Sequence, residues 1–268
     1  MRLSPGLPRW APALAGVGFL VIAAPVFALV WRAPWSMLGS LLASRPALSA
    51  LRLSLITSLG ATVACLVIGV PAALVLSRAN GPAASVARAI MLIPLVLPPM
   101  VSGLAMLLLL GRRGLVGGPL AQLTGYALPF TTPAVIVAQT FVALPFLIVS
   151  AEGSLRAAGL EFERAAASLG ARPTRVLRTV TLPLLAPALR GGTVLCFARA
   201  LGEFGATALF AGNLPGVTQT MPLSIYTAFN GSDIGQDVAT ALSLVLIGVS
   251  LVLLIASGTM GRVRAGHG

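Results

Sequence analysis

Long apolar stretches alternate along the chain with short stretches rich in arginine, glycine and proline. Six of the apolar stretches each have about the 20 residues needed to cross a hydrocarbon layer about 30 Å thick. They cover residues 11–30, 53–76, 89–110, 133–151, 184–210 and 238–257. The pattern predicts an all-α integral membrane protein with six transmembrane helices.

The first apolar stretch has two interpretations. Val26-Phe27-Ala28 would tolerate cleavage of a secretory signal peptide. The apolar core is longer than that of a typical signal, which favours a retained anchor. We therefore expect residues 1–50 to form an N-terminal anchor helix and an external loop, residues 51–257 the main transmembrane domain, and residues 258–268 a cytoplasmic tail.

The third stretch contains Pro94, Pro98 and Pro99. Proline frees backbone carbonyl groups, which at membrane depth are tolerated only against protein or a water-lined cavity. These prolines predict either a packing kink or a break that lines a translocation pathway. Pro98 and Pro99 are therefore candidate pathway residues.

A charged segment separates the fourth and fifth stretches and predicts a short helix over Glu161–Leu169. Glu161 and Glu163 fall in its first turn, where carboxylates favour the positive end of the helix. Gly170 follows where a left-handed C-terminal cap would lie, and Pro173 prevents the same helix from continuing. The segment is thus expected to be a capped mini-helix between two spans.

The mini-helix has either lipid or protein as its partner. Its larger apolar groups are Leu160, Phe162 and Leu169, which is little for an interfacial helix resting on lipid. Ala165 and Ala166 are small and permit close backbone approach. This composition favours docking in the groove of another protein.

The fifth stretch carries Arg199 and Glu203. A charge at the membrane centre costs about 2.5–3.5 kcal/mol even on the lenient insertion scale, so such residues normally face protein or water. In one continuous helix, their four-residue spacing would place them on one face. They are either a structural pair that holds helices together or a gate that contacts an anion, and we expect at least one of them to face the pathway.

Composition excludes several classes of protein. The chain has 268 residues, of which 57% are hydrophobic and 9% charged, so it is too apolar for a soluble domain. The net charge of +12 comes from arginines that flank or interrupt apolar runs, which argues against nucleic-acid binding.

Cys65 and Cys196 lie inside apolar stretches and are expected to be packing residues. The absence of lysine excludes a standard Walker A site, so any ATP must be bound by another subunit.

The arginines also predict the orientation. With the N-terminus inside, inner segments hold roughly twice as many arginines as outer ones, which places both termini and the mini-helix in the cytoplasm. Arg172, Arg175 and Arg178 recur every third residue and would reach anionic lipid headgroups along one helix side.

The segment from Glu163 to Gly170, followed by Leu182-Pro183, resembles the cytoplasmic signature of type I ABC importer permeases, E-A-A-x3-G and then L-P. Arg164 holds the place of the usual Glu, with Glu163 one position earlier. The segments FARALGEFGAT (197–207) and AGNLPGVTQTMPLSIYTAF (211–229) resemble the molybdate permease branch. The resemblance covers roughly residues 50–257, which would be the permease domain.

The resemblance implies that the mini-helix is a coupling helix, which passes the closure of a cytoplasmic ABC ATPase to the membrane spans. The residues assigned to coupling are Glu161, Glu163, Ala165, Ala166, Leu169 and Gly170; those assigned to the pathway are Arg199, Glu203, Pro98 and Pro99. It also implies a homodimer, an external oxyanion-binding protein and molybdate or tungstate as substrate. We expect no catalytic residue, metal or cofactor. The alternatives are a sulfate or thiosulfate permease and, from a different class, an ion-coupled secondary transporter.

Overall fold

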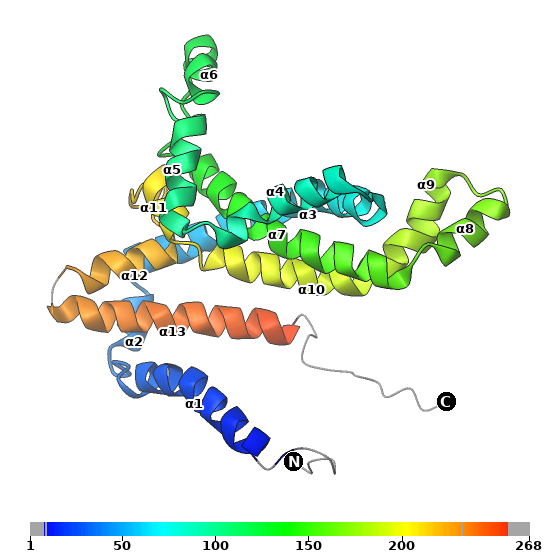
Figure 1. Ribbon diagram of the computed structural model, residues 1–268. Helices are drawn as coiled ribbons and strands as arrows, with labels where there is room; N and C mark the ends of the chain where they lie inside the picture. The colour runs from blue at the N-terminus through cyan, green and yellow to red at the C-terminus, as the bar shows by residue number, and fades with distance from the viewer. Residues whose placement is uncertain (1–7, 9, 232, 257–268) are drawn as a thin grey trace.

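The structure is a computed structural model that describes residues 8, 10–231 and 233–256 (Figure 1). Every regular element in this part of the chain is a helix, as the apolar pattern predicts. The helices are α1 (Trp10–Trp31), α2 (Leu38–Leu42), α3 (Arg45–Arg78), α4 (Pro82–Val96), α5 (Pro99–Leu110), α6 (Gly117–Thr124), α7 (Thr132–Ala158), α8 (Glu161–Ser168), α9 (Pro173–Val176), the π-helix η1 (Leu177–Thr181), α10 (Leu182–Leu201), α11 (Gly205–Phe210), α12 (Met221–Phe229) and α13 (Asp233–Ala256). The predicted tail over residues 258–268 lies outside the described residues.

The centre of the fold is a bundle of α3, α7 and α10, which lie side by side in Figure 1. Small residues let these helices approach closely: a Cβ atom added to Gly192 on α10 would lie 3.1 Å from both Leu147 Cδ1 and Ser150 Cβ on α7. Ser150 Oγ also donates to the backbone carbonyl of Ala188 at 3.0 Å. Cys65 and Cys196 are free thiols buried in this core, which confirms their predicted role in packing.

The third predicted span is two helices and not one straight helix. α4 and α5 meet at a bend of 116°, and α5 turns away from the bundle (Figure 1). Of the kink and the break that the prolines of residues 89–110 predict, the structure has a break, because Leu97 and Pro98 adopt extended backbone conformations between the two helices. Five single helices of the described chain are long and apolar enough to cross a membrane, or six spans if the bent pair counts as one.

The fifth predicted span is also interrupted. A helical run begins at Pro173, passes through η1 and α10 and ends at Leu201; α11 starts only at Gly205. The prediction of one continuous helix over 184–210 is wrong at residues 202–204. Gly202 lies at the C-terminal end of α10, and the carboxylate of Glu203 caps the first turn of α11. At the N-terminal end of α10, Pro183 is the second residue of the helix and has no backbone N–H to donate. The π-helix η1, whose turns are wider than those of an α-helix, ends just before this helix.

The first and last long helices lie beside this bundle. α13 packs on α12 and α3 through a cluster that contains Met221, Leu242, Ala47 and Ala50. α1 has no buried residue although its mean hydropathy over an 18-residue window is 2.5. Its apolar surface therefore requires lipid or another protein chain as its surroundings.

Candidate functional site

The predicted mini-helix is present as α8, an eight-residue helix held apart from the bundle (Figure 1). Its C-terminus has two hydrogen bonds of a Schellman motif: Gly170 N–H donates to Ala167 O at 2.9 Å, and Ala171 N–H donates to Ala166 O at 3.1 Å. Gly170 has a φ of 82°, which confirms the predicted left-handed cap. The helix therefore ends at a fixed position and the chain turns sharply into α9.

Glu163 anchors α8 to the rest of the molecule. Its Oε1 and Oε2 atoms accept from Arg78 Nη2 at 2.9 and 3.0 Å, and Oε1 also accepts from Thr181 Oγ1 at 2.5 Å. Only 16% of the Glu163 side chain is exposed. The carboxylate thus joins α8 to the end of α3 and to η1, and it faces this chain and not a partner. Any part that Glu163 plays in coupling would consist of holding α8 in place.

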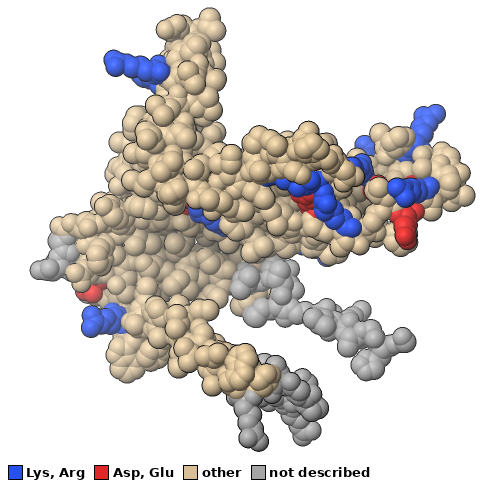
Figure 2. Space-filling view, viewed as in Figure 1, with Lys and Arg blue, Asp and Glu red and all other residues tan. Residues whose placement is uncertain are grey.

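The outer surface of α8 carries the remaining residues assigned to coupling. Phe162 is 61% exposed and Leu169 is 88% exposed. Ala165 and Ala166 share one helix face with them, since their spacing follows the helical repeat. Basic side chains gather at this end of the molecule in Figure 2. Among the exposed residues of α8, α9 and η1 and the turn between them are Arg164, Arg172, Arg175 and Arg178. α8 therefore presents a small apolar face within a basic surface.

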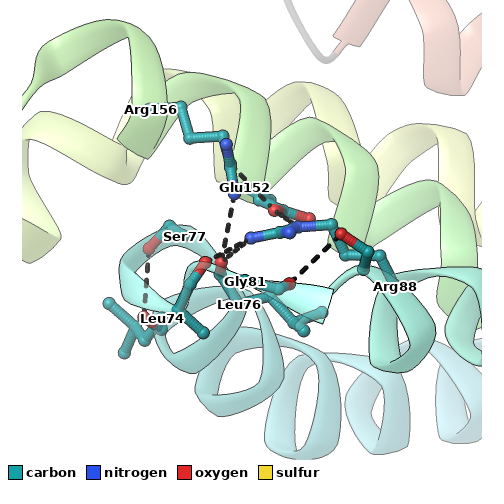
Figure 3. Close-up of polar contacts among 9 residues, drawn as sticks. Leu74, Leu76, Ser77, Gly81, Arg88, Glu152 and Arg156 are labelled. Carbon is teal, nitrogen blue, oxygen red and sulfur yellow. Dashed lines mark hydrogen bonds and ion pairs between the residues drawn. The ribbon is translucent and has the colours of Figure 1, made fainter. Parts of the chain in front are cut away.

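A second charged cluster, which the sequence analysis missed, joins α3, α4 and α7 (Figure 3). Glu152 Oε1 accepts from Arg88 Nε at 2.6 Å and from Arg156 Nε at 2.9 Å. Arg88 Nη2 also donates to the backbone carbonyls of Leu76 and Ala79 at the end of α3, at 2.5 and 2.7 Å. The spacing of Glu152 and Arg156 by four residues was a usable signal for a helical ion pair, but nothing in the sequence pointed to Arg88.

The other charged group lies where α10 ends. Arg199 Nη1 and Glu203 Oε2 form an ion pair at 2.7 Å, and the side chain of Glu203 is 1% exposed. Its second oxygen, Oε1, accepts from the backbone N–H of Ala206 at 2.8 Å, which caps the first turn of α11. The buried carboxylate of Glu203 therefore has two partners: the guanidinium of Arg199 and the first turn of α11.

The four residues assigned to the pathway lie around this break. A Cβ atom added to Gly205, the first residue of α11, would lie 2.6 Å from Pro99 Cβ. The start of α11 thus packs directly on the corner between α4 and α5. Pro98 and Pro99 are exposed at that corner, and the Arg199 side chain is 28% exposed. The arrangement brings a partly accessible guanidinium and two interrupted helices to the same end of α10, about 30 Å along that 20-residue helix from η1.

An apolar cavity of about 420 Å³ lies elsewhere, between α3, α5 and α7. Ile68, Met106, Leu110 and Phe141 are among the residues that line it, and none of its lining residues is charged. It therefore offers no charged group to an oxyanion.

Comparison with known proteins decides the family. Residues 65–259 match the family model described as "Binding-protein-dependent transport system inner membrane component". The chain belongs to this family. It is thus a multi-pass membrane protein and a transport subunit, and the ion-coupled secondary transporter does not fit this assignment.

Relatives of this permease are similar over nearly its whole length. It is 47% identical over 254 residues to the molybdenum transport system permease protein of Mycobacterium bovis, covering 94% of each chain. It is 32% identical over 255 residues to the sulfate transport system permease protein of Salmonella typhimurium, covering 92% of this chain and 91% of that one. In structure the permease is similar to a chain of the bacterial alginate ABC transporter solved in complex with a periplasmic protein, with a TM-score of 0.73, 17% identity and coverage of 94% and 93%. The solved structure supports the fold alone.

Proposed function

We propose that this permease is the membrane-spanning subunit of an ABC importer for molybdate. The observation that carries the proposal is the 47% identity to a molybdenum permease across 94% of both chains, against 32% to a sulfate permease over a similar length. The partly exposed Arg199 guanidinium at the α10–α11 break supplies a positive contact suited to an oxyanion. Tungstate, a tetrahedral dianion of similar size, would be a second substrate.

Energy would come from separate ATPase subunits that dock on α8. The chain has no lysine for a Walker A site, and Phe162 on α8 and Leu169 at its C-terminal end are exposed apolar side chains that suit a contact with another protein. Glu163 fixes α8 to α3 and η1, so a displacement of α8 would move these helices with it. In this mechanism docking and release of α8 select between two arrangements of the spans.

Two further partners would complete the transporter. A second copy of the permease would cover part of the exposed apolar surface, such as that of α1. The two copies would enclose a shared pathway beside Pro98, Pro99, Arg199 and Glu203. An external oxyanion-binding protein would deliver the substrate, as the periplasmic protein in the solved alginate transporter complex suggests. The permease itself then needs only weak contacts with the anion.

The proposed orientation places both termini, α8 and α9 in the cytoplasm, because the arginines concentrate on that side. Reporter fusions after Asn80, Arg172 and His267 should give cytoplasmic signals, and fusions after Gly117 and Gly216 should give external ones. An external signal after Arg172 would contradict both the orientation and the docking of α8 on a cytoplasmic ATPase.

The substrate assignment is tested in cells. A strain that lacks this chain should lose high-affinity molybdate uptake and keep sulfate uptake, since the permease resembles the molybdenum relative more closely. Uptake of both radiolabelled anions is measured in the deletion strain and in the same strain with the gene restored. Loss of sulfate uptake alone would replace the molybdate assignment with the sulfate one.

A further inference from the structure

α4 is held to the rest of the molecule by little apolar burial. Every residue of this helix is described, and of these only Ala84 is buried, whereas many residues of α3 and α7 are buried. A turn of three residues, 79–81, connects α3 to α4, and within it Gly81 has a φ of 92°. Glycine has more backbone freedom than any other residue, so this turn alone does not fix the angle between the two helices. Other contacts must determine how α4 is oriented.

Arg88, in the first half of α4, provides such contacts. Its Nε donates to Glu152 Oε1 on α7 at 2.6 Å, and its Nη2 donates to the carbonyls of Leu76 and Ala79 at 2.5 and 2.7 Å (Figure 3). Leu76 lies in the last turn of α3, where the backbone carbonyls have no partner within the helix. The side chains of Arg88 and Glu152 are only 23% and 13% exposed, so water competes little for these bonds. One guanidinium thus joins α4 to both α3 and α7.

Arg156 contacts the same two acceptors as Arg88. Its Nε donates to Glu152 Oε1 at 2.9 Å, and its Nη2 donates to Leu76 O at 3.4 Å. Because Arg156 and Glu152 both belong to α7, this second set of bonds joins α7 to α3 and does not hold α4. If Arg88 were replaced, Glu152 would keep a cationic partner, and no carboxylate would be left uncompensated. The two arginines therefore share their acceptors, but only Arg88 positions α4.

The contacts of Arg88 lie beside the anchor of α8. Arg78, which holds Glu163 on α8, follows Leu76 by two residues on α3. Leu76 and Arg78 thus belong to one turn of α3, which contacts α8 through one residue and α4 through the other. A displacement of α8 would reach the contacts of Arg88 through less than one helical turn.

The far end of α4 is its corner with α5. From Arg88 the helix continues for eight residues, about 12 Å, to Val96, and the corner follows directly. The start of α11 packs on this corner, because a Cβ atom added to Gly205 would lie 2.6 Å from Pro99 Cβ. α4 is therefore held near one end by Arg88 and contacts the start of α11 through the corner at its other end.

We propose that Arg88 is a positioning residue that makes α4 move with α3 and α7, so that a displacement of α8 changes the α4–α5 corner and the adjoining α11. The proposal rests on the function proposed above, in which an ATPase displaces α8. Glu152 is the acceptor that fixes Arg88 relative to α7. Without Arg88, the ATPase would still move α8 and α3, but the corner would no longer follow.

Arg88→Gln tests the proposal, with Arg156→Gln as the matched control. Each change removes one arginine from Glu152 and leaves the other, so both variants should fold. In the full transporter in lipid vesicles, Arg88→Gln should lower the molybdate transported per ATP hydrolysed about tenfold while ATP hydrolysis persists. Arg156→Gln should keep this ratio within about twofold, and Arg88→Lys, which retains the charge, should recover part of the loss. Equal ratios in the two Gln variants, or a parallel fall of hydrolysis and uptake in Arg88→Gln, would overturn the proposal.

A spin label measures the motion of α4 independently of the substrate. Cys65 and Cys196 are fully buried and are replaced by Ala, and Val96, 84% exposed at the end of α4, is replaced by Cys and labelled. ATP should change the mobility of this label in the assembled transporter, and Arg88→Gln should remove the change. No response during ATP hydrolysis, or the same response with and without Arg88, would overturn the proposal. If the unsubstituted transporter carries no molybdate, the proposed function fails, and the label still shows whether Arg88 transmits the motion.

Discussion

Replacing Arg199 by Ala should abolish molybdate uptake and lower the amount of folded permease. The change leaves the carboxylate of Glu203, which is 1% exposed, without its cationic partner. Removing one member of a buried ion pair costs about 3–5 kcal/mol, because an uncompensated charge stays behind. Expression, detergent stability and uptake of radiolabelled molybdate are the measurements.

The double change Arg199→Ala with Glu203→Gln separates folding from transport. The Gln side-chain oxygen can still accept from Ala206 N–H, so the cap of α11 remains and no charge is left unpaired. We expect normal expression with uptake still about tenfold or more below wild type, since the positive contact is gone. Replacing both members of a buried ion pair is often tolerated when the pair is only structural. Full uptake by the double variant would therefore mean that Arg199 and Glu203 have only a structural role.

Replacing Gly170 by Val should uncouple ATP hydrolysis from transport. Gly170 has a φ of 82°, which a β-branched residue adopts only at a cost of about 1–3 kcal/mol. A Cβ atom added there would meet nothing within 4 Å, so the effect arises from the backbone alone. The turn after α8 should change, and Leu169 would lose its fixed position. We expect ATPase activity of the assembled transporter to persist while molybdate uptake falls about tenfold.

Two variants control for this result. Gly170→Asn should retain uptake, since Asn tolerates the left-handed conformation. Gly153→Ala on α7 adds a methyl group where nothing lies within 4 Å and φ is not positive, so it should leave uptake unchanged. Normal coupled uptake by Gly170→Val at normal expression would argue against α8 as the element that receives the ATPase motion.

The local features of the fold were predictable from the sequence because they depend on neighbouring residues. The start of α8, its end at a left-handed Gly170 and the helical state of the apolar stretches all follow from capping and periodicity. The two interrupted spans were predicted only in part, since the prolines of the third span indicated a kink or a break, whereas the interruption of the fifth span at residues 202–204 was not predicted. Hydropathy does not distinguish a straight apolar helix from α4 and α5, which meet at 116°, and the prolines indicated a break without its angle.

The charged contacts were less predictable because their members lie far apart in the chain. Glu163 pairs with Arg78, 85 residues away, and Glu152 pairs with Arg88, 64 residues away. A single sequence gives no measure of such proximity. Only the pairs with helical spacing, Glu152 with Arg156 and Arg199 with Glu203, leave a local signal. The cap that Glu203 provides to α11 depends on the break after Leu201, which was not foreseen.

We propose that this chain forms the membrane pathway of an ATP-driven molybdate importer. The most direct test is uptake of radiolabelled molybdate into lipid vesicles that contain the permease assembled with its ATPase, with the external binding protein present. We expect saturable uptake that requires ATP and all three proteins, is inhibited by tungstate and is not inhibited by an equal concentration of sulfate. Uptake that proceeds without ATP, or uptake of sulfate in place of molybdate, would contradict it.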